Sequence, residues 1–124
     1  MNFRADLAAK VMVGRKTVTR RRMSDNPRSP WYRHACSMIH GRSYAVCPGR
    51  GKAAIGRVLV TDVRAATLGD VDDHEAHLEG FPRRASFVAA WTEINGDFDP
   101  HELVWRVVFQ TIPAPPSPAA VGER

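Results

Sequence analysis

The side chains whose types and spacing suggest chemistry surround a tight turn, Pro48-Gly49-Arg50-Gly51. A glycine-rich turn lets backbone N–H groups and flanking cations approach a phosphate closely. Arg50, Lys52 and Arg57 supply such cations, and Tyr44 could either stack on a base or form part of the wall of the fold. The G-x-x-x-x-G-K-[ST] spacing of a P-loop is absent. The cluster therefore predicts a nucleic-acid contact and not the phosphate-binding loop of a nucleoside triphosphatase.

The histidines and cysteines are residues of this sequence that could bind a zinc ion. His34, Cys36, His40 and Cys47 are close in the sequence, but their spacing matches no common zinc pattern. The segment His74-Glu75-Ala76-His77 is one residue short of the zinc-protease motif, so its histidines are not one helical turn apart. We predict no metal and no cofactor, with these two histidines exposed on a helix.

Positive charge is concentrated in the first half of the chain. Residues 1–64 hold 14 of the 18 Lys and Arg and 3 of the 13 Asp and Glu, a net charge of +11, whereas residues 65–124 carry −6. Clustered cations attract polyanions and release their condensed counterions on binding. RNA is therefore an expected partner, and a solvated basic surface is the alternative. The predicted nucleic-acid contacts in this half are Arg15, Arg20, Arg22, Tyr44, Arg50, Lys52 and Arg57.

Length and composition limit the class of protein. A chain of 124 residues with 44% hydrophobic and 25% charged residues has room for one globular domain. No apolar run is long enough for a membrane span or a signal peptide, so we expect no membrane partner and a cytoplasmic location. The two cysteines are then expected to be free thiols. We expect a monomer.

The first half of the chain alternates short strands with one helix and one long loop. An amphipathic helix is predicted over residues 5–13, ended by a glycine at residue 14, with a possible short strand before it at Phe3. Strands are predicted over residues 16–21, 43–47 and 53–64. The proline-containing loop over residues 24–42 is long enough to suggest a functional role.

The second half is predicted to hold two helices and the strongest strand. One helix should begin at an Asp70 N-cap and end near Leu78, and a second should run from Pro82 to about Ile94. A strand covers residues 102–112, and residues 113–124 are predicted to be a disordered Pro- and Ala-rich tail. Phe87, Trp91, Trp105 and Phe109 are assigned to the core. The pattern indicates an α+β domain built on a small, partly open barrel.

Three segments together resemble the ASCH domain, a family with a PUA-like barrel. Residues 14–21, Gly-Arg-Lys-Thr-Val-Thr-Arg-Arg, are similar to its G-x-K-T-x-T-x-R signature. Residues 44–46 with 56–63 resemble its central strand pair, and residues 76–81, Ala-His-Leu-Glu-Gly-Phe, resemble the end of its helix. The resemblance covers residues 3–112. It implies a PUA-like β-barrel of about five to six strands with two to three flanking helices over residues 1–112.

The resemblance also implies a site. Some family members with the same Lys, Thr and Glu positions are amidohydrolases that deacetylate N4-acetylcytidine, which makes Lys16, Thr19 and Glu79 candidate catalytic residues. Amide hydrolysis needs a nucleophile, a base and a donor to the developing oxyanion. Thr19 would supply the hydroxyl, Lys16 the base or the cation, and Glu79 would orient Lys16. Since residues three apart do not share a face of a strand, Lys16 must precede the strand for this site to exist.

Three functions remain open at this stage. The leading one is a domain that binds RNA or a modified nucleoside and recognises a pyrimidine-like base in a basic pocket at the barrel mouth. The second is an amidohydrolase acting on N4-acetylcytidine-type nucleosides, which predicts contact between Lys16 and Glu79. The third is a ribonuclease on single-stranded RNA, with Tyr44 and Lys52 in the reacting positions. The long loop over residues 24–42 departs from the compact amidohydrolases.

Overall fold

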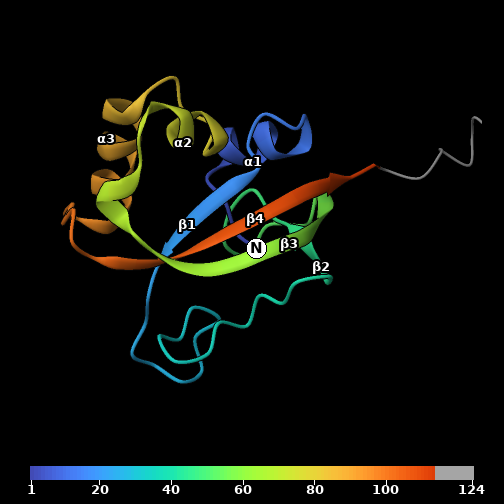
Figure 1. Ribbon diagram of the computed structural model, residues 1–124. Coiled ribbons are helices and arrows are strands. Elements are labelled where there is room, and N and C mark those ends of the chain that lie inside the picture. The colour runs from blue at the N-terminus through green and yellow to red at the C-terminus, as the bar shows by residue number, and fades with distance from the viewer. Residues whose placement is uncertain (114–124) are drawn as a thin grey trace, which may run out of the picture.

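A four-stranded antiparallel sheet carries three helices along one side in the computed structural model, which describes residues 1–113 (Figure 1). The spatial order is β1-β4-β3-β2. The strands are β1 (Val18–Arg22), β2 (Ser43–Val46), β3 (Gly56–Thr67) and β4 (Leu103–Ile112). The helices are α1 (Ala5–Met12), α2 (Asp73–Leu78) and α3 (Arg84–Asn95), with a short 3-10 turn at Leu68–Asp70. The predicted tail, apart from Pro113, lies outside the described residues.

The prediction of five to six strands was wrong for the described residues, which form four. β1 and β2 are the two edges of the sheet, and the sheet is not closed. The first strand expected at Phe3 is reduced to an isolated bridge between Asn2 and Cys47, because α1 begins at Ala5 and ends the extended segment. The α+β class is confirmed, and the helix count agrees with the two to three expected.

The core lies between the helices and the sheet. Leu7, Ala8 and Val11 form the buried face of α1, as their spacing predicted. Gly14 follows this helix with φ +77°, the left-handed conformation that favours glycine after a helix end. The sheet contributes buried side chains from its two central strands, β3 and β4, which make the most extensive strand pairing in the fold. The Thr17 N–H donates to the Leu78 carbonyl at 2.9 Å, which holds the segment after α1 against the end of α2.

The starts of α2 and α3 differ from the predictions, the first because of a local cap and the second because of a contact between helices. α2 begins at Asp73 with Asp72 as its N-cap, whose carboxylate accepts the Glu75 N–H at 2.8 Å, so the Asp70 N-cap was wrong. α3 begins at Arg84 and not at Pro82, because the Arg84 N–H donates to the Asp73 carboxylate at 2.8 Å. A contact between the two helices therefore sets the start of α3, whereas the cap at Asp72 sets the start of α2.

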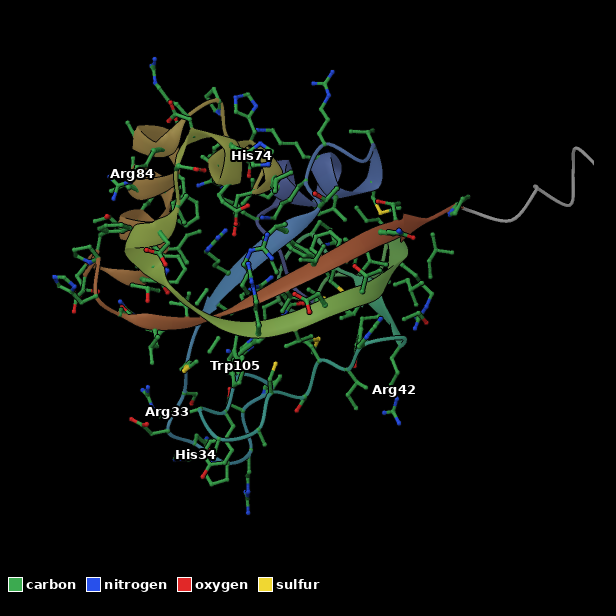
Figure 2. All side chains as sticks on the ribbon, in the orientation of Figure 1. Arg33, His34, Arg42, His74, Arg84 and Trp105 are labelled. Atoms are coloured by element: carbon green, nitrogen blue, oxygen red, sulfur yellow. The ribbon has the colours of Figure 1, made fainter. Side chains whose placement is uncertain are left out.

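The long loop lies on the side of the sheet away from the helices, where Trp105 anchors it (Figure 2). The indole N–H of Trp105 donates to the carbonyls of Trp31 at 3.2 Å and Tyr32 at 3.1 Å. Trp105 is half-buried, so its assignment to the core was wrong, whereas Phe87, Trp91 and Phe109 are in the core. Alternation along β4 puts the Trp105 ring on the face opposite to that of its neighbour Arg106, which contacts α2.

Both cysteines, Cys36 and Cys47, are free thiols, as predicted. Within residues 1–113, no helix combines the length and apolar character that crossing a membrane requires.

Candidate functional site

Lys16 lies in the segment between α1 and β1, outside the regular strand, as the candidate site required. Its side chain is 2% exposed. The ammonium donates to the Val18 carbonyl at 2.7 Å, to the Glu79 carbonyl at 2.9 Å and to Glu79 Oε1 at 2.9 Å. All three N–H donors of the charged group are therefore satisfied, two of them by one residue 63 positions away.

Glu79 is the C-cap of α2 and is 3% exposed. Gly80 follows it with φ +94°, and this turn directs both the Glu79 carbonyl and its carboxylate at Lys16. The second carboxylate oxygen accepts a hydrogen bond from Arg20 at 3.0 Å. The prediction that Lys16 and Glu79 are neighbours is confirmed, and the structure adds Arg20 as a third member of the cluster.

The cluster continues across the sheet. Arg20 on β1 also binds Glu75 of α2, and Glu75 binds Arg106 of β4 through contacts of 2.8 and 3.2 Å. Arg20 and Arg106 are register partners in the β1–β4 pair, which explains why one carboxylate reaches both. Five charged side chains thus alternate in sign from the loop before β1 to β4.

Burial and pairing shift two pKa values in this cluster. Burial lowers the pKa of Lys16, and the Glu79 carboxylate opposes that shift without cancelling it. Burial alone would raise the pKa of Glu75, but hydrogen bonds from Arg106 and Arg20 lower it to about 2. A buried lysine with a lowered pKa can lose its proton more readily than a lysine in water.

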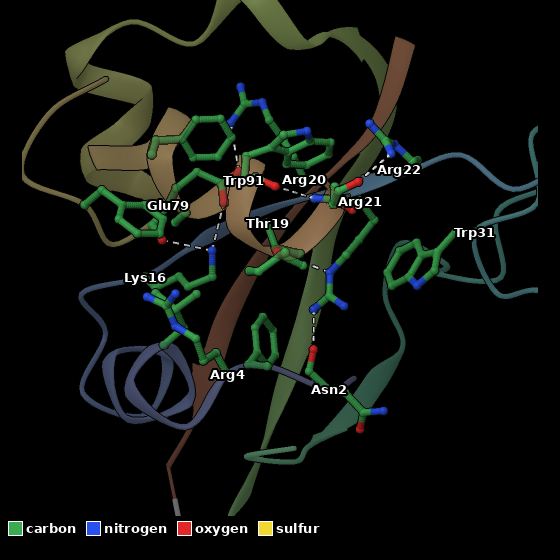
Figure 3. Close-up of a pocket in the computed structure, with 17 residues that line it drawn as sticks. Asn2, Arg4, Lys16, Thr19, Arg20, Arg21, Arg22, Trp31, Glu79 and Trp91 are labelled. Atoms are coloured by element: carbon green, nitrogen blue, oxygen red, sulfur yellow. Dashed lines mark hydrogen bonds and ion pairs between the residues drawn. The ribbon is translucent and has the colours of Figure 1, made fainter. Parts of the chain in front are cut away.

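Thr19 is buried on β1 and lines the same pocket as Lys16 and Glu79. Its hydroxyl oxygen lies 3.4 Å from Nε of Arg21, a long hydrogen bond. The structure therefore brings the three candidate catalytic residues to one pocket (Figure 3). Their roles in a reaction remain a proposal.

Arg21 is a site residue that the sequence analysis did not select. Its guanidinium lies between the rings of Phe3 and Trp31, 4.9 and 5.1 Å from their centroids, and donates to the Asn2 carbonyl at 2.6 Å. Burial lowers its pKa to about 10, so it stays charged at neutral pH. The available signal was its position as the last residue of the G-x-K-T-x-T-x-R signature.

The pocket has a volume of about 310 Å³ and lies between β1, α1 and α3, with Trp31 of the long loop at one side (Figure 3). Phe3, Phe81, Phe87 and Trp91 give it aromatic walls. A pocket of this size with aromatic walls and a few polar groups is typical of a small-molecule site.

Two of the residues predicted to contact nucleic acid form ion pairs within the fold instead. Arg20 is buried in the charged cluster, and Arg22 pairs with Glu102 at 2.9 Å and with Asp97 at 2.5 Å. The Tyr44 hydroxyl accepts from the Ile39 N–H at 2.8 Å and donates to the Ser37 carbonyl at 3.1 Å. That hydroxyl holds the loop in place with both of these hydrogen bonds. Its proton is therefore not free for the ribonuclease role suggested for Tyr44.

The other predicted contacts are exposed. Arg15 follows α1, Arg50 and Lys52 lie in the turn between β2 and β3, and Arg57 donates to Ser43 across the β2–β3 edge. Since β1 and β2 are opposite edges of the sheet, Arg50, Lys52 and Arg57 do not extend the pocket on β1, and Arg15 is not among the residues that line it. Among residues 1–113, no group of three or more His, Cys, Asp or Glu is placed to hold a metal ion.

Comparison with known proteins identifies the fold. No protein-family model matches the sequence, and no curated protein matches it by sequence. A structure from Enterococcus faecalis V583 described as family DUF984 matches with a TM-score of 0.64 and 17% identity, covering 86% of this chain and 70% of that one. The ASCH domain from Lactobacillus crispatus JV V101 matches with a TM-score of 0.60, 17% identity and the same coverages. A point mutant of an ASCH protein from Zymomonas mobilis matches with a TM-score of 0.55 and 16% identity over 99% of this chain and 77% of that one.

Proposed function

We propose that this chain, which has the fold of the ASCH domain, is an amidohydrolase that removes the acyl group from N4 of an acylated cytidine-type nucleoside. Water is consumed, the amide bond breaks, and cytidine and a carboxylic acid are released. The observation that carries the proposal is the buried contact between Lys16 and Glu79 beside Thr19 in a pocket of about 310 Å³. Fold likeness alone would not support an activity.

The residues of the pocket suit the separate requirements of amide hydrolysis. Thr19 supplies the hydroxyl that attacks the acyl carbon. Lys16, whose pKa burial lowers, takes the hydroxyl proton in its neutral form and passes it to the departing N4 amino group, and Glu79 holds Lys16 in place. Water then hydrolyses the ester formed on Thr19, which releases the carboxylic acid and restores the hydroxyl. Arg21 is the cation next to the Thr19 hydroxyl and is the donor to the oxyanion that forms at the acyl oxygen.

Most cations of the pocket are paired with carboxylates, and this pairing favours a small substrate over a polynucleotide. Lys16 and Arg20 bind Glu79, and Arg22 binds Glu102, so their charges are matched within the fold. Among the cations that line the pocket, Arg21 has a backbone carbonyl and a hydroxyl as partners and no carboxylate from residues 1–113. One uncompensated guanidinium is suited to one developing negative charge and not to a phosphate chain.

The test is incubation of the purified protein with N4-acetylcytidine, with chromatographic detection of cytidine. Thr19→Ser should retain part of the activity and Thr19→Val should lose it by about 100-fold or more, because the hydroxyl is the reacting group. Thr61→Val makes the same change on β3, outside the pocket, and should leave the rate unchanged. Full activity of Thr19→Val would exclude Thr19 as the nucleophile.

The pH dependence of kcat/KM tests the role of Lys16. A base with a pKa below its usual 10.5 predicts that the rate rises with pH and levels off below pH 10.5, because the neutral amine is the active form. A rate that does not change between about pH 6 and 10 would contradict this role.

A further inference from the structure

Two buried N–H groups have no hydrogen-bond acceptor among residues 1–113, and both belong to residues that line the pocket. They are Nε of Arg20 and Nε1 of Trp91. Arg20 is 6% exposed and Trp91 is 5% exposed. Buried polar groups without a partner are rare in native proteins because desolvating them has a cost that nothing offsets. Two of them in one pocket point to a ligand that supplies the acceptors.

Both donors are held in fixed positions. The terminal nitrogens of Arg20 bind Glu79 and Glu75, so the guanidinium cannot rotate to satisfy its Nε–H elsewhere. The Trp91 ring packs against Phe87, 6.0 Å between centroids, and the guanidinium of Arg22 lies 6.0 Å from its centroid. Figure 3 shows both side chains at the pocket wall formed by β1 and α3. Donors fixed before binding cost little ordering when a ligand arrives.

The acceptors that these donors require are neutral. The charge of Arg20 is already matched by two carboxylates, and an indole N–H carries no charge. A ring oxygen or ring nitrogen is therefore a better partner than a phosphate, which would add negative charge beside Glu79 and Glu75. The aromatic walls of the pocket also favour a flat ring.

We propose that Arg20 and Trp91 recognise the O2 and N3 acceptors of a cytosine-type ring and reject uracil, whose N3 carries a hydrogen. This inference rests on the proposed function for the identity of the ring. An N–H donor facing the N3–H of uracil would leave two buried donors opposed, whereas cytosine places a lone pair there. Arg20 and Trp91 are thus specificity residues, with a role different from those of Lys16, Thr19 and Glu79, although Arg20 also binds Glu79.

Cytidine itself is a suitable probe because an acyl group at N4 leaves O2 in place and N3 without a hydrogen. Cytidine is also the product of the proposed reaction, so its binding is measured without turnover. We expect calorimetric titration to show that the wild-type protein prefers cytidine to uridine by about tenfold or more, the discrimination expected when a site would leave its donors unpaired. Failure to bind cytidine, or equal binding of the two nucleosides, would overturn the inference.

Trp91→Phe keeps an aromatic ring and removes the donor. It should reduce the preference for cytidine over uridine by about three- to tenfold, the share of one hydrogen bond. Trp31→Phe is the matched control, because it makes the same change in the same pocket at a side chain that is not an orphaned buried donor. That control should keep the preference even if both affinities change. An unchanged preference in Trp91→Phe would overturn the role of this residue.

A measurement on the wild-type protein avoids any folding defect of the variants. In NMR spectra of protein labelled with ¹⁵N-tryptophan, the Trp91 indole proton should move downfield on saturation with cytidine, and the Trp105 indole proton should not, because it already donates to the loop. Displacement of cytidine by inorganic phosphate at similar concentrations would show that the donors hold an anion and would overturn the inference. Preferential cytidine binding without any hydrolysis of N4-acetylcytidine would remove the proposed reaction and support the inference.

Discussion

At the scale of single residues, Glu79 joins the two buried cations of the site, Lys16 and Arg20. One carboxylate oxygen binds Lys16 and the other binds Arg20, while its backbone carbonyl accepts from Lys16. Loss of the carboxylate would leave two buried cations short of a partner, whereas loss of Lys16 would leave Glu79 still bound to Arg20. Breaking a buried pair by removing one partner is strongly destabilising, since an unpaired charge remains.

Glu79→Gln should therefore lower the free energy of unfolding by on the order of 3–5 kcal/mol, and Lys16→Met should lower it by less. Urea denaturation at neutral pH measures both. Glu93→Gln, which changes an exposed carboxylate on α3, serves as the control and should have little effect. A larger loss for Lys16→Met than for Glu79→Gln would contradict the central place given to Glu79.

At the scale of elements, α2 is tied to the sheet through Glu75, which contacts Arg20 of β1 and Arg106 of β4. The folded-state pKa of Glu75 is about 2 and lies below the ordinary value of 4.5. A lowered folded pKa means that this contribution to stability is complete above pH 4.5 and is lost as the pH falls toward 2. Acidification should thus loosen the contact between α2 and the sheet.

We expect wild-type stability to fall more steeply between pH 4.5 and 2 than that of Glu75→Gln, which lacks this titrating group. Urea midpoints measured at intervals across that range give the comparison. Parallel curves for the two proteins would show that Glu75 is not linked to folding in this way.

The long loop is a second element, which Trp105 anchors at residues 31–32 and the Tyr44 hydroxyl anchors at residues 37–39. Trp105→Phe removes both hydrogen bonds to the loop carbonyls while leaving a ring on β4. Local opening of the loop should rise roughly two- to tenfold, because the single indole N–H that the two carbonyls share contributes on the order of 0.5–1.5 kcal/mol. Tryptic cleavage after Arg28 and Arg33 in this loop reports the opening. Unchanged cleavage rates would mean that other contacts hold the loop.

At the scale of the whole molecule, the two halves of the chain have complementary charges because they pair with each other. Lys16, Arg20 and Arg22 of the basic half bind Glu75, Glu79, Asp97 and Glu102 of the acidic half. Part of the asymmetry that suggested a polyanionic partner is therefore internal. Arg50 and Lys52 are exposed in the turn between β2 and β3 and remain candidates for RNA binding.

RNA binding through this turn is a second candidate function, supported by the two exposed cations beside Gly49 and Gly51. Affinity for single-stranded RNA should fall as salt rises, and replacing Arg50 and Lys52 with Ala should reduce the log–log salt slope by about 1.4, since each phosphate contact contributes about 0.7. Arg83→Ala, at an exposed cation beside α3, is the control. Binding that is insensitive to salt would exclude this electrostatic account.

Local patterns in the sequence were sufficient to predict most helices and strands and one contact in the site, between Lys16 and Glu79. The spacing of Leu7 and Val11 predicted α1, and β-branched alternation predicted β4, because these signals depend on neighbours along the chain. The resemblance of residues 14–21 and 76–81 to ASCH signatures placed Lys16 with Glu79. The same signature contained Arg21, which strand alternation places on the face of Thr19, whereas its contacts with Phe3 and Trp31 depend on tertiary packing.

Tertiary packing alone decided the rest. Arg20 meets Glu79 across 59 residues only because α2 docks on β1, and the N–H groups of Arg20 and Trp91 are orphaned only because packing buries them. The strand pattern of residues 102–112 placed Trp105 in the core, but it does not determine whether the ring faces the helices or the loop. A sequence records which side chains avoid water, whereas the choice of partner for a buried charge depends on how distant elements pack.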